Sequence, residues 1–264
     1  MPQTASEFRK RYGAWAVVAG ASEGLGAAFV EALASRGMNL LLIARRADAL
    51  ESLAGRIRHE REVEVRTLPI DVASPSFGAT LTSISADLEI GLLVFNAAYA
   101  PVGGFFDLPE EDLLQAVDVN VRGPIVFLRC LAPAMLERRR GGIVLMSSLS
   151  GMQGSPRIAT YAATKAFNTV LGEGLWSELG EQGIDVVASC AGAIRTPGYA
   201  ETSAKDAPGI LDPEEVAETT LRALGSGPRV IPGRVNQIAS VLMQRVLPRR
   251  VAIALMAANT RKLS

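Results

Sequence analysis

The residues Gly20-Ala21-Ser22-Glu23-Gly24-Leu25-Gly26 form a glycine-rich loop from which the expected architecture can be built outward. The loop follows a short apolar run, Ala14–Ala19, and leads into an amphipathic stretch, Gly24–Arg36, so it joins a predicted strand to a predicted helix. Glycines allow the backbone to turn sharply and to approach a diphosphate, which the free amides at the helix N-terminus attract. The spacing is G-x-x-x-G-x-G rather than G-x-G-x-x-G, and its setting predicts a dinucleotide-binding βαβ unit.

Beyond this loop, apolar runs and amphipathic stretches alternate along the chain. Apolar runs without polar interruption predict strands that are buried on both faces, which is typical of a parallel sheet covered by helices. The alternation predicts an α/β fold, a doubly wound parallel sheet of Rossmann-like type. The further predicted strands are Asn39–Ala44, Val65–Ile70, Leu92–Phe95, Gly142–Met146 and Ile184–Ser189, and the further predicted helices are Ala47–Arg61, Ser74–Leu88, Glu110–Leu136 and Ala159–Leu179.

Length and composition narrow the class of protein. The chain has 264 residues, 48% hydrophobic and 20% charged, which is enough for a large core and gives no sign of extended disorder. Its formal net charge of zero argues against nucleic acid as the main partner, because duplex binding relies on a basic surface. No repeat or proline-rich linker divides residues 1–264, so a single domain is predicted. The irregular stretch 192–211 follows the carboxyl end of a strand, where such folds bind ligands, and is predicted to be a mobile substrate loop.

Other signals concern the compartment and the kinds of chemistry to exclude. Cys130 and Cys190 are far apart among apolar or small residues, which predicts buried, reduced thiols in a cytoplasmic protein. No apolar run of the signal-peptide kind follows the basic N-terminus, and none approaches the roughly 18 apolar residues of a membrane-spanning helix. His59 is the only histidine and lies on a charged helix. We therefore expect neither a Ser-His-Asp triad nor a metal site.

The end of the second predicted strand bears on the choice of cofactor. An acidic residue there would accept hydrogen bonds from a ribose 2′-hydroxyl and repel a 2′-phosphate, but this chain has Arg45 and Arg46 and no acid before Asp48. Arginine offers a planar set of donors that suits phosphate oxygens. The pattern predicts NADP(H), with Arg45 as the favoured contact and Ser22 as a helper. The alternative is that both arginines form the solvated start of a helix.

Four polar residues stand out as candidates for catalysis. Tyr161 and Lys165 are four residues apart in a predicted helix and therefore share one face, where the ammonium is expected to lower the pKa of the phenol. Ser148 follows the strand at the carboxyl edge of the sheet, where its hydroxyl can donate to the same substrate oxygen. Asn120 lies in an apolar helical stretch, and its amide is either a satisfied core group or the anchor of a water chain.

In this order and spacing, the glycine loop, Asn120, Ser148 and the Tyr161/Lys165 pair resemble the short-chain dehydrogenase/reductase family over roughly residues 14–223. The resemblance implies that hydride passes from a nicotinamide to a carbonyl carbon while Tyr161 protonates the oxygen. Ser148 is implied to orient that oxygen and stabilise its charge, Lys165 to lower the pKa of Tyr161 and bond the nicotinamide ribose, and Asn120 to position a proton-relaying water.

The resemblance also implies a set of cofactor contacts. Asp71 is expected to hold the adenine ring, and Thr196 to meet the nicotinamide carboxamide. Phe95, Ala98 and Ala191 depart from the Asn, Gly and Pro usual in the family, but none of them carries chemistry. The expected cofactor-binding residues are Gly20, Ser22, Glu23, Gly24, Leu25, Gly26, Arg45, Arg46, Asp71, Val72, Asn96, Ala97, Tyr161, Lys165, Ile194 and Thr196.

Together these features predict an NADP(H)-dependent oxidoreductase that acts on a hydrophobic ketone, aldehyde or alcohol. The alternatives are a non-catalytic NADP(H)-binding sensor or scaffold, which the intact Ser148, Tyr161 and Lys165 argue against, and an isomerase or dehydratase on the same fold. Apolar positions beyond one buried stripe, including Leu114 and Phe127, predict a homo-oligomer, dimer or tetramer, that pairs through the two longest helices.

The C-terminal end has a composition of its own. From Thr219 to Ser264 there is no Asp or Glu, and arginines alternate with aliphatic residues, so 237–264 is predicted to be a basic amphipathic segment. It either folds over the substrate loop as a lid or lies on an anionic membrane. Pro248 interrupts the segment and no aromatic anchor lies within it, which favours the lid.

Overall fold

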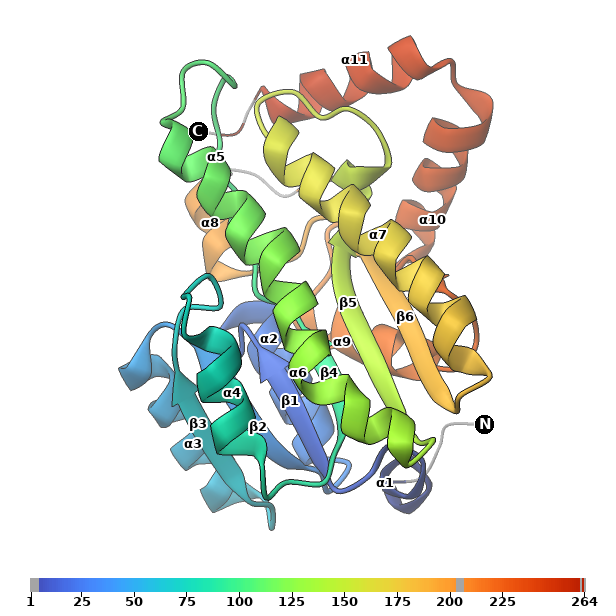
Figure 1. The fold of residues 1–264 in the computed structure, drawn as a ribbon. Helices are drawn as coiled ribbons and strands as arrows, with labels where there is room; N and C mark the ends of the chain where they lie inside the picture. The colour runs from blue at the N-terminus through green and yellow to red at the C-terminus, as the bar shows by residue number, and fades with distance from the viewer. Residues whose placement is uncertain (1–4, 203–206, 262, 264) are drawn as a thin grey trace.

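Seven parallel strands form one sheet with helices on both faces (Figure 1), in a computed structural model that describes residues 5–202, 207–261 and 263. The strand order is β3-β2-β1-β4-β5-β6-β7, so the direction of winding reverses between β1 and β4. In such sheets the crevice for the ligand opens at the carboxyl ends of the strands at this reversal. The strands are β1 (Trp15–Ala19), β2 (Asn39–Ala44), β3 (Val65–Pro69), β4 (Ile90–Phe95), β5 (Gly141–Ser148), β6 (Ile184–Ala191) and β7 (Arg229–Val230). The predicted doubly wound fold is confirmed.

Side chains of alternate strand residues divide the core into two layers. The helices are α1 (Ala5–Tyr12), α2 (Gly24–Ala34), α3 (Ala47–Glu60), α4 (Phe77–Ser85), α5 (Glu110–Val117), α6 (Gly123–Glu137), α7 (Ala159–Gly180), α8 (Pro197–Thr202), α9 (Pro213–Ala223), α10 (Arg234–Val241) and α11 (Arg249–Thr260). In β1, Val18 packs into a layer with α2, α3 and α9, whereas Val17 packs into the opposite layer with α4 and α6. Burial on both faces explains why the strands are apolar throughout.

The N-terminal helix α1 and the edge strand β7 were not expected from the sequence. Phe8 and Tyr12 of α1 are buried, and the Tyr12 hydroxyl donates to Asp185 Oδ2 at 2.9 Å. The charged run Arg9–Arg11 hides this apolar face in the sequence. Strand β7 has two residues, which is too short to show a period.

The long helix predicted over Glu110–Leu136 contains an interruption. A π-helical turn, η1 (Asp118–Arg122), separates α5 from α6 and carries Asn120. The continuous stretch Glu110–Glu137 is long and apolar enough to cross a membrane by length and composition, contrary to the expectation that no segment would be. In this fold half of its most apolar window is buried, and α6 packs on α4 and β4, so it serves as a core helix.

The two cysteines, the stretch 192–211 and the C-terminal segment can also be compared with what the sequence predicts. Cys190 is buried, but Cys130 is only half-buried, because it lies on α6 beside Gly78 rather than in the core. The stretch 192–211 includes α8, and its two ends meet where Ile194 pairs with Leu211; residues 203–206 of this stretch lie outside the described residues. The C-terminal segment forms α10, a π-helical turn η3 (Leu242–Val246) and α11, which cross the end of the sheet where β5 and β6 finish (Figure 1).

Candidate active site

The glycine-rich loop has no room for a side chain at Gly20 and Gly26. Gly20 has a φ of +80°, and a Cβ there would lie 2.6 Å from Ala97 Cα; a Cβ on Gly26 would lie 1.8 Å from the Gly20 carbonyl oxygen. Asn96 Nδ2 donates to the same oxygen at 2.9 Å and fixes the loop against β4. The bare backbone at the start of α2 is a cradle that fits a diphosphate.

This loop forms one end of a cleft of about 1390 Å³ at the carboxyl edge of the sheet. The expected cofactor residues all line the cleft except Gly26, which packs under the Gly20 carbonyl. Thr196 lies directly against the loop, since a Cβ on Gly24 would come 2.9 Å from its Cγ2. Asp71 Oδ1 accepts a hydrogen bond from the Ala73 amide at 2.8 Å, which fixes the carboxylate at the wall of the cleft.

The two arginines that follow β2 differ in their contacts. Arg46 Nη2 lies 2.6 Å from Glu23 Oε2 and 3.4 Å from the Ser22 hydroxyl oxygen. Arg45 is exposed at the mouth of the cleft. Both can reach a phosphate group, but only Arg46 has its charge partly compensated by an acid of the glycine loop.

Ser148 ends β5 and faces the cleft. Its Oγ accepts hydrogen bonds from the Ser150 amide at 3.2 Å and from the Ser150 hydroxyl at 2.9 Å. A serine hydroxyl has two acceptor positions and one donor hydrogen, so Ser150 leaves the Ser148 hydrogen directed at other partners. Sequence reasoning missed Ser150, because a second serine after a strand carries no recognisable pattern.

Tyr161 and Lys165 project from α7 into the same cleft. Burial raises the pKa of the Tyr161 phenol, and a hydrogen bond with the Ser148 side chain offsets this only in part. Burial also lowers the pKa of Lys165 from 10.5 to about 8. Lys165 Nζ donates to the Met146 carbonyl oxygen at 3.0 Å and lies 5.6 Å from the centre of the Tyr161 ring. The predicted lowering of the Tyr161 pKa is therefore wrong for this structure, because burial, the largest cause, raises it.

Asn120 lies behind the cleft rather than in its wall. It is fully buried, and its Nδ2 donates to the Tyr99 carbonyl oxygen at 2.8 Å and to Thr164 Oγ1 at 3.0 Å. Its Oδ1 accepts from the Tyr99 amide at 2.9 Å. Both amide hydrogens are thus used by protein groups, so the side chain braces the segment after β4 against α7. Of the two interpretations of Asn120, the satisfied core group agrees with these contacts.

The far end of the cleft is formed by the C-terminal segment. Met243, Leu255 and Met256 line it opposite Met152 and Gln153, which follow β5. Arg249 Nη1 donates to the Met152 carbonyl oxygen at 2.8 Å and holds the start of α11 in place. The structure thus agrees with the predicted lid, in which the inner face of this segment covers the substrate end.

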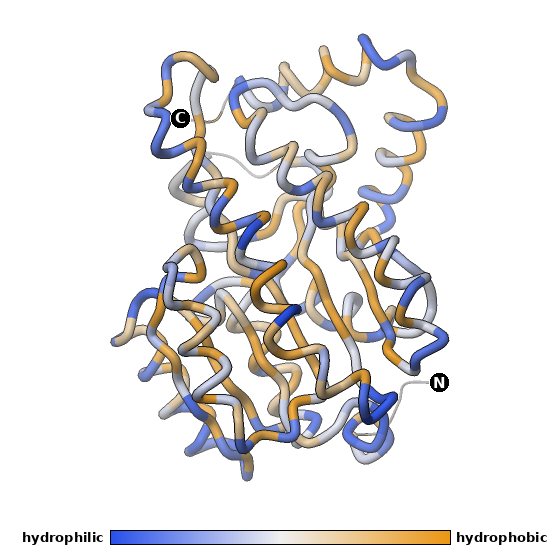
Figure 2. Tube along the Cα trace, in the orientation of Figure 1, coloured by the Kyte–Doolittle hydropathy of each residue, from blue (hydrophilic) through white to orange (hydrophobic). Residues whose placement is uncertain are grey.

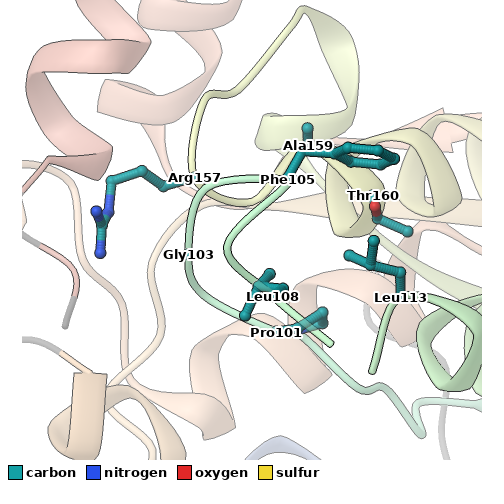
Figure 3. Close-up of a pocket in the computed structure, with 8 residues that line it drawn as sticks. All are labelled: Pro101, Gly103, Phe105, Leu108, Leu113, Arg157, Ala159 and Thr160. Carbon is teal, nitrogen blue, oxygen red and sulfur yellow. The ribbon is translucent and has the colours of Figure 1, made fainter. Parts of the chain in front are cut away.

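A second, much smaller hollow lies where the segment 101–108 meets the start of α7 (Figure 3). Its volume is about 10 Å³, which is at the lower limit for a single water, so it is no substrate site. Arg157 marks its border: its carbonyl oxygen accepts from the Gly103 amide at 2.8 Å, and its Nη2 donates to the Leu263 carbonyl oxygen at 3.2 Å.

Within the described ranges, no group of three or more His, Cys, Asp or Glu side chains could hold a metal ion. The doubly wound sheet, the phosphate cradle and the serine, tyrosine and lysine at its carboxyl edge define a nicotinamide-dependent oxidoreductase of Rossmann type. Residues 14–207 match the family model for short chain dehydrogenases, and the chain belongs to this family.

One curated relative and two solved structures illustrate the similarity. A 7beta-hydroxysteroid dehydrogenase from Clostridium sardiniense is 32% identical over 233 residues, covering 87% of this chain and 89% of the relative. A solved 7beta-hydroxysteroid dehydrogenase structure, from work on stereoselectivity, has a TM-score of 0.88 and 28% identity and covers 94% of this chain and 98% of that one. A short-chain dehydrogenase from Sphingobium yanoikuyae in complex with NADPH has a TM-score of 0.75 and 31% identity, covering 83% of this chain and 86% of that one.

Proposed function

We propose that this oxidoreductase uses NADP(H) to reduce a ketone on a bulky hydrophobic compound, or to oxidise the corresponding alcohol. The observation that carries the proposal is one continuous cleft, which the phosphate cradle, Ser148 and Tyr161, and the inner face of the C-terminal segment all line. Such continuity lets one binding site hold a dinucleotide and a large substrate together.

The residues present fit a nicotinamide dinucleotide. The cradle at Gly20 and Gly26 admits a diphosphate and no side chain, and Arg45, exposed in the same cleft, would hold a 2′-phosphate. A relative in complex with NADPH gives the same preference independent support. When bound, the cofactor supplies or takes up the hydride.

The chain's own residues supply the proton and the charge stabilisation. Because the pKa of Tyr161 is raised, its phenol is protonated at neutral pH and can donate a proton to the substrate oxygen during reduction. Ser148 donates its single hydroxyl hydrogen to the same oxygen and stabilises the charge that develops there. Lys165 bears an ammonium below a pH of about 8. Asn120 holds the wall behind them in place.

The lining of the cleft indicates the substrate class. Its charged residues, Glu23, Arg45, Arg46, Asp71 and Lys165, belong to the cofactor half. The described residues of the substrate half instead include Met152, Met243 and Met256, whose flexible thioethers adapt to bulky apolar shapes. A hydroxysteroid or its ketone is accordingly the first class to test, since the relative from Clostridium sardiniense and one of the two solved structures described above are 7beta-hydroxysteroid dehydrogenases.

The test is a panel of steroid ketones, long-chain acyl thioesters and small ketones with NADPH and NADH, followed by nicotinamide absorbance. Turnover of the steroid ketones with NADPH supports the proposal. Turnover confined to small polar ketones, or to NADH, would contradict the substrate class or the cofactor respectively. A cytoplasmic location and a homo-oligomeric state remain parts of the proposal, supported by the free thiols and by exposed apolar positions on α5, α6 and α7.

A further inference from the structure

Large aliphatic side chains are exposed along the outside of the C-terminal segment. Ile238 is 70% exposed, Val246 64%, Val241 53% and Leu242 44%. Soluble surfaces rarely gather such residues in one place unless a partner covers them. Figure 2 shows hydrophobic and hydrophilic positions alternating through this segment, in contrast to the continuous hydrophobic strands.

Helix geometry separates the two sides of α10 and η3. Asn236 and Ser240 are buried and Met243 lines the cleft, at a spacing of four and three residues. Arg234, Ile238, Val241 and Arg245 are spaced by four, three and four residues and are all exposed, so they share the opposite side. We call the exposed set Arg234, Ile238, Val241, Leu242 and Arg245 the outer stripe. Because the inner side already serves the cleft, the outer stripe has no role in closing it.

The segment of chain that carries the outer stripe has charges of one sign. No Asp or Glu occurs between residues 219 and 264. Among the residues that the structure describes, no ion pair involves Arg234, Arg245 or Arg250. Aliphatic side chains flanked by unpaired arginines match the boundary of an anionic bilayer, where acyl chains lie beneath phosphate groups.

We propose that the outer stripe docks the protein on an anionic membrane surface. A lid and a membrane contact are therefore compatible, because they use opposite sides of the same helix. A symmetric pair of copies is the weaker occupant, since it would bring the arginines of two stripes together. Val235 and Ala239 lie on the side of α10 between the inner side and the outer stripe, and they line the cleft. Docking would therefore bring the substrate end of the cleft close to the lipid.

The test is co-sedimentation of the full chain with vesicles of phosphatidylcholine, with and without phosphatidylglycerol. The wild-type protein should bind the anionic vesicles and lose binding as salt is raised. The double variant Arg234→Gln/Arg245→Gln should bind anionic vesicles about tenfold or more weakly, because each basic residue near such a surface contributes to binding. The double variant Ile238→Gln/Leu242→Gln should weaken vesicle binding at every salt concentration, because it removes the apolar contact with the acyl chains.

Matched controls come from exposed residues outside the C-terminal segment and outside α5, α6 and α7. Phe106→Gln in the segment 101–108, where Phe106 is 96% exposed, and Arg61→Gln after α3 should leave vesicle binding unchanged. Turnover in detergent-free buffer should be the same for all variants, because none of the substituted residues lines the cleft. The vesicle experiment therefore tests membrane docking separately from the proposed reaction. Absence of wild-type binding to anionic vesicles would overturn the proposal. Full vesicle binding by the variants of the outer stripe would also overturn it. A lower particle mass of these variants in solution would do so as well, because it would assign the outer stripe to contact with a second copy.

Discussion

Arg46 is paired with Glu23, with Nη2 and Oε2 2.6 Å apart, at the adenosine end of the cleft. The acid belongs to the glycine loop and the base follows β2, so the ion pair joins the two segments that frame the adenosine end. Both side chains are about half exposed, which makes the pair easy to rearrange when a ligand arrives. Its consequence is that Arg45, rather than Arg46, offers the less compensated positive charge.

Arg45→Ala is expected to weaken NADPH binding more than Arg46→Ala, and neither should change NADH binding much. A charge-assisted hydrogen bond contributes about 1.5–3 kcal/mol, so the loss for Arg45 is about tenfold to a hundredfold. Glu23→Gln should tighten NADPH binding at low ionic strength, because it removes a negative charge beside the 2′-phosphate. Fluorescence titration with both cofactors measures this. Equal affinities for NADPH and NADH in the wild-type protein would exclude the assignment.

Tyr161→Phe keeps the ring and removes the phenolic proton. Turnover is expected to fall by at least about a hundredfold, the usual effect of losing a general acid, while NADPH binding and thermal unfolding stay close to wild type. Tyr12→Phe is the control, because it removes a hydroxyl that bonds Asp185 at the other end of the sheet. A Tyr161→Phe enzyme with near wild-type turnover would rule out this mechanism.

The buried ammonium of Lys165 predicts two effects of pH. The pKa falls from 10.5 in the unfolded chain to about 8 in the folded one, so the unfolded chain binds more protons between these values. Stability contributed by Lys165 should therefore rise with pH from about 8 to about 10.5 and stay constant below 8. If catalysis needs the ammonium, kcat/KM for reduction falls as pH rises above about 8. Lys165→Met should lose both dependences, as thermal melts and pH–rate profiles would show.

Local patterns explain what the sequence could predict. The glycine loop and the Tyr161/Lys165 pair are each contained in one short segment, so their residue types and spacing are visible without coordinates. The contacts of Asn120 were hidden, because Tyr99 and Thr164 are 21 and 44 residues away. The pKa of Tyr161 was predicted in the wrong direction, since spacing shows a neighbouring charge but not the burial around it. In the C-terminal segment, periodicity shows two sides of a helix but not which side meets the protein.

Self-association is expected through α5, α6 and α7. Phe127 is fully buried in the core, so it contributes nothing to such a surface, but Val170 is 68% exposed, Leu114 54% and Ile125 43%. Covering these side chains with a symmetric copy removes apolar surface from water. Light scattering should give the mass of a dimer or tetramer at micromolar concentration. The double variant Leu114→Glu/Val170→Glu should have a mass closer to that of the monomer. A wild-type protein that is strictly monomeric would refute this surface.

Asn236 joins the C-terminal segment to both ends of the stretch 192–211. It is buried, and its Nδ2 donates to the carbonyl oxygens of Gly209 and Pro232, each at 3.0 Å. Gly192 and Gly209 both pack against this side chain. A Cβ added to Gly192 would lie 2.8 Å from Asn236 Oδ1, and a Cβ added to Gly209 would lie 2.7 Å from it. Both ends of the stretch are thus held at one amide.

Asn236→Leu keeps the size of the side chain but leaves both carbonyl oxygens without this donor, which costs about 1–3 kcal/mol in a buried setting. We expect KM for the substrate to rise while kcat changes little, because the wall of the substrate end loosens and Ser148 and Tyr161 stay in place. Gly209→Ala should act in the same direction, since its φ of +76° strains any other residue and its Cβ meets Asn236. Gln237→Ala on the exposed side of α10 is the control. A fall in kcat with unchanged KM would show that Asn236 acts on the catalytic residues instead of on the substrate wall.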